Sequence, residues 1–323
     1  MKQSKFFLLM VLSLVTMLLL AACGGNSEEA EETEEPKPTE ENTSYTVENA
    51  METVTLDKTP ERVVILTNEG TEALLALGVK PVGAVQSWTG DPWYDHIASE
   101  MEGVEVVGLE SQVNVEAIAA LQPDLIIGNK MRQEDIYEQL SKIAPTVFAE
   151  TLRGNWKENF ELYAKAVNKV EEGNQVLADY DNRIKEIQTK LGEDVNKEVS
   201  MVRFMAGDVR IYHKDSFSGV ILEQIGFARP ESQDVDDFAE KNATKERIPA
   251  MDGDILFYFT YEVGDGKATN LEKEWIEDPL FQNLEVAKAG EVYKVDDAIW
   301  NTAGGVIAAN LMLDDIEKYF LSE

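Results

Sequence analysis

The sequence predicts an α/β protein with two lobes that are joined by one long helix, and a ligand cleft between the lobes. Apolar runs of the β type alternate with helical patterns on both sides of residues 155–192. That segment is polar and carries an apolar stripe at three- and four-residue spacing, which is typical of one helical face. A short echo between Ala120–Ile126 and Ala250–Leu256 indicates duplication. Two similar lobes would leave a cleft, the usual place for a small ligand.

The N-terminal residues predict an export signal that ends in a lipidated cysteine. Lys2 and Lys5 precede an apolar run that is too short for a mature membrane span. The run closes on Leu-Ala-Ala-Cys, which resembles the bacterial lipobox, and Cys23 is the only cysteine in the chain. We predict a lipoprotein signal peptide over residues 1–22, with two acyl chains on Cys23 as the membrane anchor. A plain signal peptide beside a leftover thiol is the alternative.

The region that follows the signal is strongly acidic, as is the whole chain. Residues 28–41 contain eight Glu, one Lys and two Pro, so we expect a disordered, self-repelling tether over residues 23–52. The formal net charge of −32 argues against nucleic acid as a partner, because phosphate binding needs a basic face. An acidic protein can still bind an anion where Arg, Lys and His side chains converge in one cleft.

The first lobe, residues 53–169, alternates strands with helices. This order predicts a parallel sheet that is covered by helices. Gly78 and Pro123 end two of these helices. The predicted strands are 62–66, 79–85, 104–108, 124–128 and 145–148, and the predicted helices are 71–77, 115–121 and 133–143.

The connecting helix, residues 170–192, separates this lobe from a second one over residues 193–323. Gly173 is a predicted weak point of the helix, and Gly192 is its predicted C-terminal stop. The second lobe is expected to repeat the plan of the first. Its predicted strands are 199–205, 209–213 and 254–259, with a helix at 218–225.

Several motifs along the chain, taken in order, resemble a known family. They are the lipobox, Arg62–Gly78, Val115–Gly128, Val209–Gly219 and Asp278–Tyr293. Together they resemble the iron-siderophore-binding lipoproteins of ABC importers, substrate-binding proteins with a helical backbone. The resemblance implies two Rossmann-like lobes on a rigid helical spine, a shallow cleft, little hinge motion, and delivery of a chelated ferric ion to a membrane permease. His213, together with Lys130–Arg132, most resembles the members that take citrate-hydroxamate or carboxylate siderophores.

Arg132 is the first candidate for ligand binding that the resemblance gives. It lies just beyond the strand 124–128, at the carboxyl end, where open α/β sheets bind ligands. Its planar guanidinium can hold a carboxylate or hydroxamate oxygen bidentately. The alternative is a solvated Arg132 that pairs with Glu134 or Asp135.

His213 and Arg203 are the second-lobe candidates. His213 matches the family position that faces the cleft. The chain has only two histidines, too few for a bare transition-metal site, so we expect His213 to hydrogen-bond siderophore oxygens; a structural His213 is the alternative. Arg203 lies mid-strand among apolar neighbours and must find a partner or water, which either the cleft or a structural ion pair would supply.

Further residues complete the predicted binding surfaces. Loop or strand-end positions that border the cleft give weaker ligand candidates, namely Lys130, Trp88, Tyr258 and Trp300. The family also uses one acidic residue on the outer face of each lobe to meet arginines of the permease. The matching helices carry Glu72 and Glu223, and a random surface glutamate is the alternative for each.

The predicted function is ligand capture without catalysis or a cofactor. The short motifs of hydrolases, zinc enzymes and nucleotide-binding loops do not occur in the chain. We expect a ferric siderophore whose own oxygens saturate the iron, an ABC permease with its ATPase as partner, and membrane contact through the lipid anchor only. We also expect a monomer on the outer face of the cell membrane of a Gram-positive bacterium. A haem or corrinoid receptor of the same fold is the nearest alternative, before a surface-anchored hydrolase or an adhesion lipoprotein.

Overall fold

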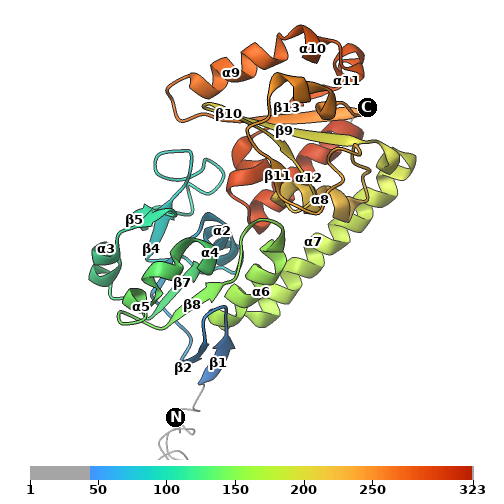
Figure 1. Ribbon diagram of the computed structural model, residues 1–323. Helices are drawn as coiled ribbons and strands as arrows, with labels where there is room; N and C mark the ends of the chain where they lie inside the picture. Colours follow the sequence, from blue (N-terminus) through green and yellow to red (C-terminus); the bar gives the residue numbers. More distant parts are fainter. Residues whose placement is uncertain (1–43, 322–323) are drawn as a thin grey trace, which may run out of the picture. The chain divides into compact units, whose positions relative to one another are not determined.

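The computed structural model describes residues 44–321, whose strands form a six-stranded sheet, a five-stranded sheet and a hairpin. Figure 1 shows the six-stranded sheet with its helices, the first lobe, below the five-stranded sheet with its helices, the second lobe. The predicted two-lobed α/β fold class is therefore confirmed. The predicted signal peptide, Cys23 and the predicted tether up to residue 43 lie outside the described residues.

The first lobe is built on a sheet with the strand order β6-β5-β4-β3-β7-β8. All neighbouring strands are parallel except β5 and β6. The central strands are buried at every position, because helices cover both faces. The strands are β3 (Val63–Ile65), β4 (Gly83–Gln86), β5 (Glu105–Leu109), β6 (Gln112–Val113), β7 (Leu125–Asn129) and β8 (Thr146–Ala149).

Two of the three predicted helices of the first lobe are present, as α2 and α3, whereas residues 133–143 differ from the prediction. That stretch is broken into α4, a 3₁₀ turn at Glu134–Ile136 and α5. The break occurs because the buried Gln133 side chain turns to the sheet, where it donates to the carbonyl oxygens of Leu66 and Glu110. The helices are α2 (Asn68–Ala76), α3 (Val115–Ala120), α4 (Lys130–Gln133), α5 (Tyr137–Leu140) and α6 (Trp156–Ala166), with a 3₁₀ turn at Arg153–Asn155.

A hairpin that the sequence did not predict begins inside the expected tether and ends beyond it. Its strands are β1 (Tyr45–Glu48) and β2 (Thr53–Leu56). Val47 and Leu56 are buried in the main core, and the Tyr45 hydroxyl donates to the carbonyl oxygen of Ala166. The ordered fold therefore begins before residue 52. The acidic stretch ends at residue 41, and β1 begins only a few residues later, at Tyr45.

The connecting helix α7 (Val170–Leu191) has the predicted bounds, and Gly192 ends it with a positive φ of 55°. Gly173 does not weaken the helix. It lies where α6 crosses, and a Cβ at this position would be 2.7 Å from the Cβ of Ala164. This glycine therefore permits close approach of two helices.

The second lobe has a mixed sheet in place of the expected copy of the first. Its strand order is β11-β10-β9-β12-β13, with β9, β12 and β13 parallel and with β10 antiparallel to its neighbours. The tight turn at Gly207 joins β9 directly to β10, which forces the antiparallel pairing. The strands are β9 (Val199–Met205), β10 (Asp208–Tyr212), β11 (Ala239–Glu240), β12 (Ile255–Tyr261) and β13 (Val292–Lys294).

The helices of the second lobe include four that the sequence did not predict. Only α8 was expected, at nearly its observed bounds. The helices are α8 (Phe217–Ile225), α9 (Lys267–Ile276), α10 (Pro279–Gln282), α11 (Glu285–Ala289) and α12 (Val306–Leu321), with 3₁₀ turns at Gly192–Asn196 and Lys245–Met251 and a π-helical turn at Ala298–Thr302. Among residues 44–321, none of the helices is both long and apolar enough to cross a membrane.

The internal echo falls on equivalent places in the two sheets. Asp124 precedes β7 and accepts a hydrogen bond from the backbone N–H of Arg62, at the start of the parallel neighbour β3. Asp254 precedes β12 and accepts one from the backbone N–H of Glu198, at the start of the parallel neighbour β9. The repeated aspartate thus aligns the beginning of a strand pair in each lobe.

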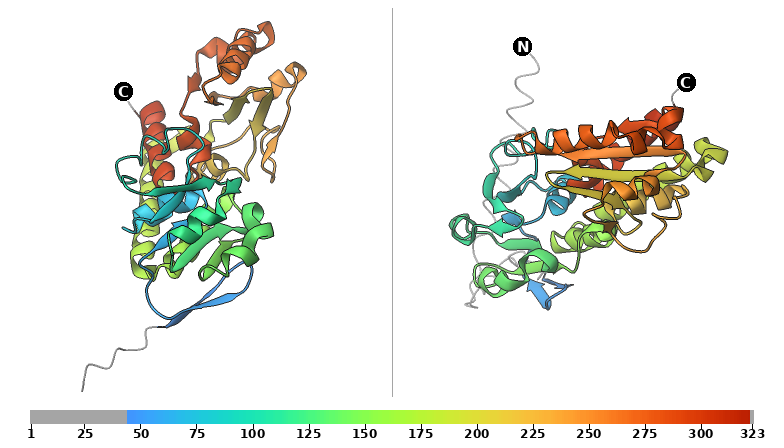
Figure 2. Two further views of the ribbon diagram at one scale, coloured as in Figure 1. Left: turned by 90° about the vertical axis from the view of Figure 1, so that its left-hand side faces the viewer. Right: turned by 45° about the horizontal axis from the view of Figure 1, so that its top comes forward.

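The apolar core is continuous between the lobes. One cluster of buried side chains reaches from Ile65 and Ile127 of the first sheet, through α6, α7 and α12, to Met201 and Phe257 of the second sheet. Separate clusters fill the outer face of each sheet. The helix α12 contacts α2 and α6 of the first lobe, α8 of the second lobe, and the connecting helix α7. It therefore forms a second connection between the lobes beside α7 (Figure 2).

Candidate ligand-binding cleft

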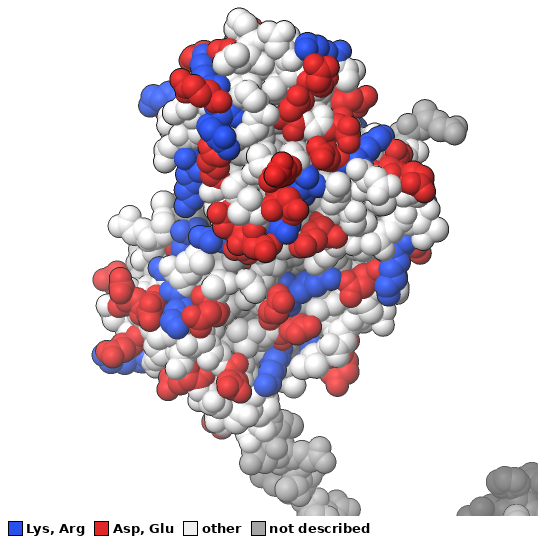
Figure 3. All heavy atoms as spheres, turned by 45° about the vertical axis from the view of Figure 1, so that its right-hand side comes forward, with Lys and Arg blue, Asp and Glu red and all other residues white. Residues whose placement is uncertain are grey.

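A cavity of about 480 Å³ lies between the lobes and gathers positive charge. Five cationic side chains line it, against two acidic ones. On the face drawn in Figure 3, acidic side chains are spread over both lobes, as the net charge of −32 requires. The cations are Arg132, Arg153, Arg203, Arg210 and Lys241, and the acids are Glu69 and Glu110.

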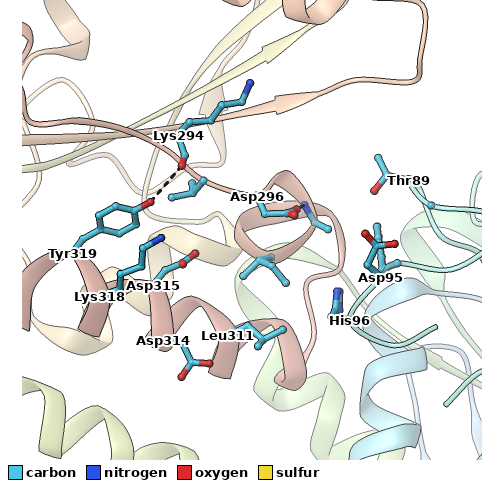
Figure 4. A pocket seen from close by; sticks show the side chains of 15 residues that line it. Thr89, Asp95, His96, Lys294, Asp296, Leu311, Asp314, Asp315, Lys318 and Tyr319 are labelled. Atoms are coloured by element: carbon cyan, nitrogen blue, oxygen red, sulfur yellow. Dashed lines mark hydrogen bonds between the residues drawn. The ribbon is translucent and has the colours of Figure 1, made fainter. Parts of the chain in front are cut away.

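A larger hollow of about 590 Å³ has the opposite character. Four aspartates line it, Asp95, Asp296, Asp314 and Asp315, together with His96, Lys294 and Lys318. Figure 4 shows Asp95 and His96 on one side of this hollow and Asp296 and Leu311 on the other. An anionic ligand is favoured where cations outnumber acids, so the smaller cavity is the candidate site.

Arg132 lies where the sequence places it, at the carboxyl end of β7 and in the cavity lining. The side chain of Asn129 caps α4 by accepting from the backbone N–H of Met131, which fixes the start of this short helix. The Nε of Arg132 donates to Glu110 at 3.3 Å, and the side chain is 42% exposed. Its partner is therefore Glu110, from the turn between β5 and β6, and both side chains line the cavity.

For Arg203 the sequence left two options open, a place in the cleft or a structural ion pair, and the structure combines them. Arg203 lines the cavity and is also ion-paired. Its Nε and Nη2 donate to the two carboxylate oxygens of Asp297 at 2.6 and 2.9 Å, and both side chains are buried. Burial opposes the charged form, but Tyr212 and Asp297 outweigh it and raise the pKa of Arg203 above its ordinary value. The guanidinium stays charged at the base of the cavity.

The two acidic side chains of the lining subtract little from this charge. Burial raises the pKa of Glu69 well above its ordinary value of 4.5, although hydrogen bonds from Asn159 and Tyr163 oppose the rise. Burial therefore favours the neutral form of Glu69 over the charged form. The carboxylate of Glu110 accepts hydrogen bonds from the backbone and side-chain N–H groups of Asn68 and from Arg132.

Aromatic rings form part of the cavity wall, and two of the cationic side chains lie over one of these rings. The guanidinium of Arg153 lies 4.6 Å from the ring centroid of Phe238, and Nζ of Lys241 lies 5.7 Å from it. The Tyr261 hydroxyl donates to the carbonyl oxygen of Trp88 at 3.2 Å, which links the two lobes across the cavity. The predicted Trp88 is thus at the site.

Sequence reasoning missed Arg153, Arg210, Lys241, Phe238 and Tyr261. Arg153 could have been found, because it follows β8 as Arg132 follows β7, at the same edge of the sheet. Its φ of 85° is rare for a residue other than glycine and marks a constrained backbone at the cavity. Phe238 and Lys241 flank β11, which the sequence did not predict, whereas Arg210 and Tyr261 lie on β10 and β12, which were predicted as strands but not as parts of the site.

His213 and Lys130 were predicted to contact the ligand, but neither side chain lines the cavity. The segment at Phe238 covers His213, whose Nδ1 is hydrogen-bonded to Asp237 and whose ring is buried. Phe238 occupies the wall in its place. Lys130 turns away and pairs with Glu150 at 2.9 Å.

Tyr258 and Trp300 also lie outside the lining. Side chains alternate along β12, so Tyr258 faces the outer cluster while Tyr261 faces the cavity. Trp300 is fully buried and donates its indole N–H to Asp315 at 2.8 Å. Trp300 is therefore a core residue, and the partly buried Tyr258 packs against the outer cluster.

The two predicted docking glutamates differ in exposure. Glu223 is exposed on α8, as a docking residue must be. Glu72 is fully buried and hydrogen-bonded, so its predicted contact with a permease is wrong. It lies on the side of α2 that meets α12, which the sequence could not show because α12 was not predicted.

The comparisons with known proteins agree with this geometry. The periplasmic binding protein family model matches residues 63–299. The chain belongs to this family. Among its relatives, the probable siderophore-binding lipoprotein YfiY of Bacillus subtilis is 56% identical over 284 residues, which cover 85% of this chain and 87% of the relative. The achromobactin-binding periplasmic protein of Dickeya dadantii is 32% identical over 80% of this chain and 86% of its own.

A solved structure of the same fold is that of Staphylococcus aureus SirA complexed with staphyloferrin B. It has a TM-score of 0.80 and 33% identity, and the match covers 86% of this chain and 99% of SirA. The family and these relatives are binding proteins rather than enzymes. Within residues 44–321, no group of three or more His, Cys, Asp and Glu side chains could hold a metal ion.

Proposed function

We propose that this periplasmic binding protein captures a ferric siderophore of the citrate-hydroxamate or carboxylate type and delivers it to an ABC permease. The observation that carries the proposal is the cationic cavity in a chain of net charge −32. Such a local cluster attracts an anionic complex that the rest of the surface repels. The names of the relatives, which refer to siderophores, achromobactin and staphyloferrin B, support this ligand class.

The cavity supplies both charge and apolar wall. Arg132, Arg153, Arg210 and Lys241 can turn N–H donors to the carboxylate and hydroxamate oxygens of the ligand. Arg203 adds a fixed charge at the base, and the rings of Trp88 and Phe238 cover the sides. The siderophore already surrounds its iron with oxygen atoms, so no protein atom is needed on the metal.

A haem receptor is less favoured by the cavity. Haem iron takes an axial ligand from the protein, commonly a histidine. Within the described residues, the cavity lining contains no histidine, and His213 is buried against Asp237.

Anchoring and docking complete the proposal. Lipid on Cys23 would hold a monomer at the outer face of the cell membrane of a Gram-positive bacterium, in agreement with relatives that are named lipoproteins. The exposed Glu223 would meet the permease, whose ATPase drives transport. Changing Glu223 to Lys should lower siderophore uptake by cells and leave ligand affinity unchanged. A loss of affinity would contradict the docking role.

Titration of the purified protein tests the ligand. Tryptophan fluorescence should show saturable binding of ferric staphyloferrin B, and weaker or no binding of the triscatecholate ferri-bacillibactin. Arg132→Ala should weaken binding by about 10- to 100-fold, because a charge-assisted contact is lost. Lys130→Ala removes a neighbouring cation outside the lining and should leave affinity unchanged. Equal binding of both chelates, or equal loss in both variants, would contradict the proposal.

A further inference from the structure

A buried carboxyl group lies between two segments that line the cavity. Glu72 on α2 is fully buried. Its Oε1 is hydrogen-bonded to Nε2 of His96 at 2.6 Å, and its Oε2 accepts from the backbone N–H of Ala308 at 2.8 Å. Burial of a carboxyl group is costly unless it is hydrogen-bonded, and here each oxygen has a partner on a different segment.

One of these bonds leads to the second-lobe side of the cavity. Ala308 lies in the first turn of α12, where backbone N–H groups have no partner within the helix and a carboxyl group is favourable. A Cβ on Gly305 would lie 2.6 Å from Cβ and Oε2 of Glu72, so α12 starts directly against α2. The preceding residues, Asn301–Gly304, all line the cavity.

The other bond leads to the first-lobe side. The ring of His96 stacks on Tyr94 with centroids 5.5 Å apart. The Tyr94 hydroxyl accepts from the backbone N–H of Trp88 at 3.4 Å, and Trp88 lines the cavity. Figure 4 shows His96 across from the second-lobe residues Asp296 and Leu311, at the boundary between the lobes.

We propose that Glu72 and His96 are positioning residues for the ligand cavity. They hold Trp88 and Asn301–Gly304, which lie on opposite sides of the cavity, at a fixed separation, and neither residue is part of the lining. The inference rests on the proposed function, because this cavity is the proposed siderophore site. It gives the buried Glu72 a role that a docking residue could not have.

Binding and hydrogen exchange of matched variants test the proposal. Glu72→Ala should bind ferric staphyloferrin B about tenfold more weakly, and its ligand-free form should exchange amide hydrogens faster in residues 88–96 and 301–308. Glu72→Gln keeps an oxygen for Ala308 and an N–H group for His96, so it should restore affinity to within about twofold. Glu161→Ala, an exposed acid on α6, is the control and should change neither.

Wild-type affinity and wild-type exchange in Glu72→Ala would overturn the proposal. If that variant does not fold, His96→Phe decides, because it keeps the Ala308 bond and a stacked ring. His96→Phe should speed amide exchange in residues 88–96 alone and should weaken ligand binding. Unchanged exchange in residues 88–96 would refute the positioning role of Glu72 and His96. A wild-type protein that binds no ferric siderophore would refute the proposed function instead. The exchange measurement needs no ligand, so it would still test whether Glu72 and His96 hold the two segments in place.

Discussion

Arg203 and Arg132 line one cavity in opposite surroundings. The side chain of Arg203 is 7% exposed and bound bidentately to the buried Asp297, whereas that of Arg132 is 42% exposed. A buried charge depends on its partner, and an exposed one is solvated by water. The first arginine should therefore stabilise the fold as well as the site, and the second should contribute less to the fold, because its partner Glu110 also accepts hydrogen bonds from Asn68.

Arg203→Ala should lower the free energy of unfolding by about 3–5 kcal/mol, because it leaves the carboxylate of Asp297 buried without a partner. The double variant Arg203→Ala/Asp297→Ala should recover part of this loss. Arg132→Ala, the comparison, should cost less than Arg203→Ala, because its buried partner Glu110 keeps two hydrogen bonds from Asn68. Urea unfolding measures all three, and equal stability of Arg203→Ala and wild type would show that the ion pair does not stabilise the fold.

Glu69 makes stability depend on pH. Burial raises its folded-state pKa above 4.5, the ordinary value that applies to the unfolded chain. The folded state therefore holds the proton to higher pH, so its stabilising effect is complete below about pH 4.5 and is lost as pH rises through the folded pKa. Glu69→Gln should remove this loss, because its amide oxygen can still accept from Asn159 and Tyr163.

The melting temperature of Glu69→Gln, relative to wild type, should therefore rise as the pH increases above about 4.5. A difference that does not change with pH would contradict the raised pKa. Ionisation of Glu69 would also add a negative charge to the cavity lining, so wild-type affinity for an anionic chelate should fall over the same range while that of Glu69→Gln falls less.

Among the elements, α7 shows what periodicity can predict. Its apolar positions Leu177, Tyr180, Ile184 and Ile187 are all buried, and its bounds agree with the sequence pattern. The second-lobe cavity wall could not be predicted in this way, because the two-residue strand β11 carries no periodic signal and places Phe238 through pairing with β10. Arg132 was found from its position after a buried strand, whereas His213 was misplaced because a distant segment covers it.

The crossing of α6 and α7 gives a prediction for Gly173. Gly173→Ala should destabilise the protein by about 1–3 kcal/mol, although alanine favours helix, because its Cβ would lie 2.7 Å from that of Ala164. The exchange Gly173→Ala/Ala164→Gly should restore most of the stability. Thermal unfolding measures the effect, with Glu171→Ala as the exposed control on the same helix. A more stable Gly173→Ala would mean that propensity outweighs the contact.

At the scale of the whole molecule, two helices and a continuous core join the lobes. Because α7 and α12 both bridge them and buried side chains run from one sheet to the other, bending between the lobes would expose apolar surface. The described residues, 44–321, belong to one compact unit. We expect ligand binding to change the radius of gyration of this unit by less than about 1 Å in small-angle X-ray scattering. A larger contraction would indicate hinge closure.

The position of α12 also constrains when the protein can finish folding. Its residues Ala309, Met312, Leu313 and Ile316 are completely buried between elements that precede it in the chain. Until residues 306–321 have packed, the apolar surfaces that will receive them are open to water or to a chaperone. The two lobes therefore cannot lock together before this last helix has joined them, wherever the chain folds.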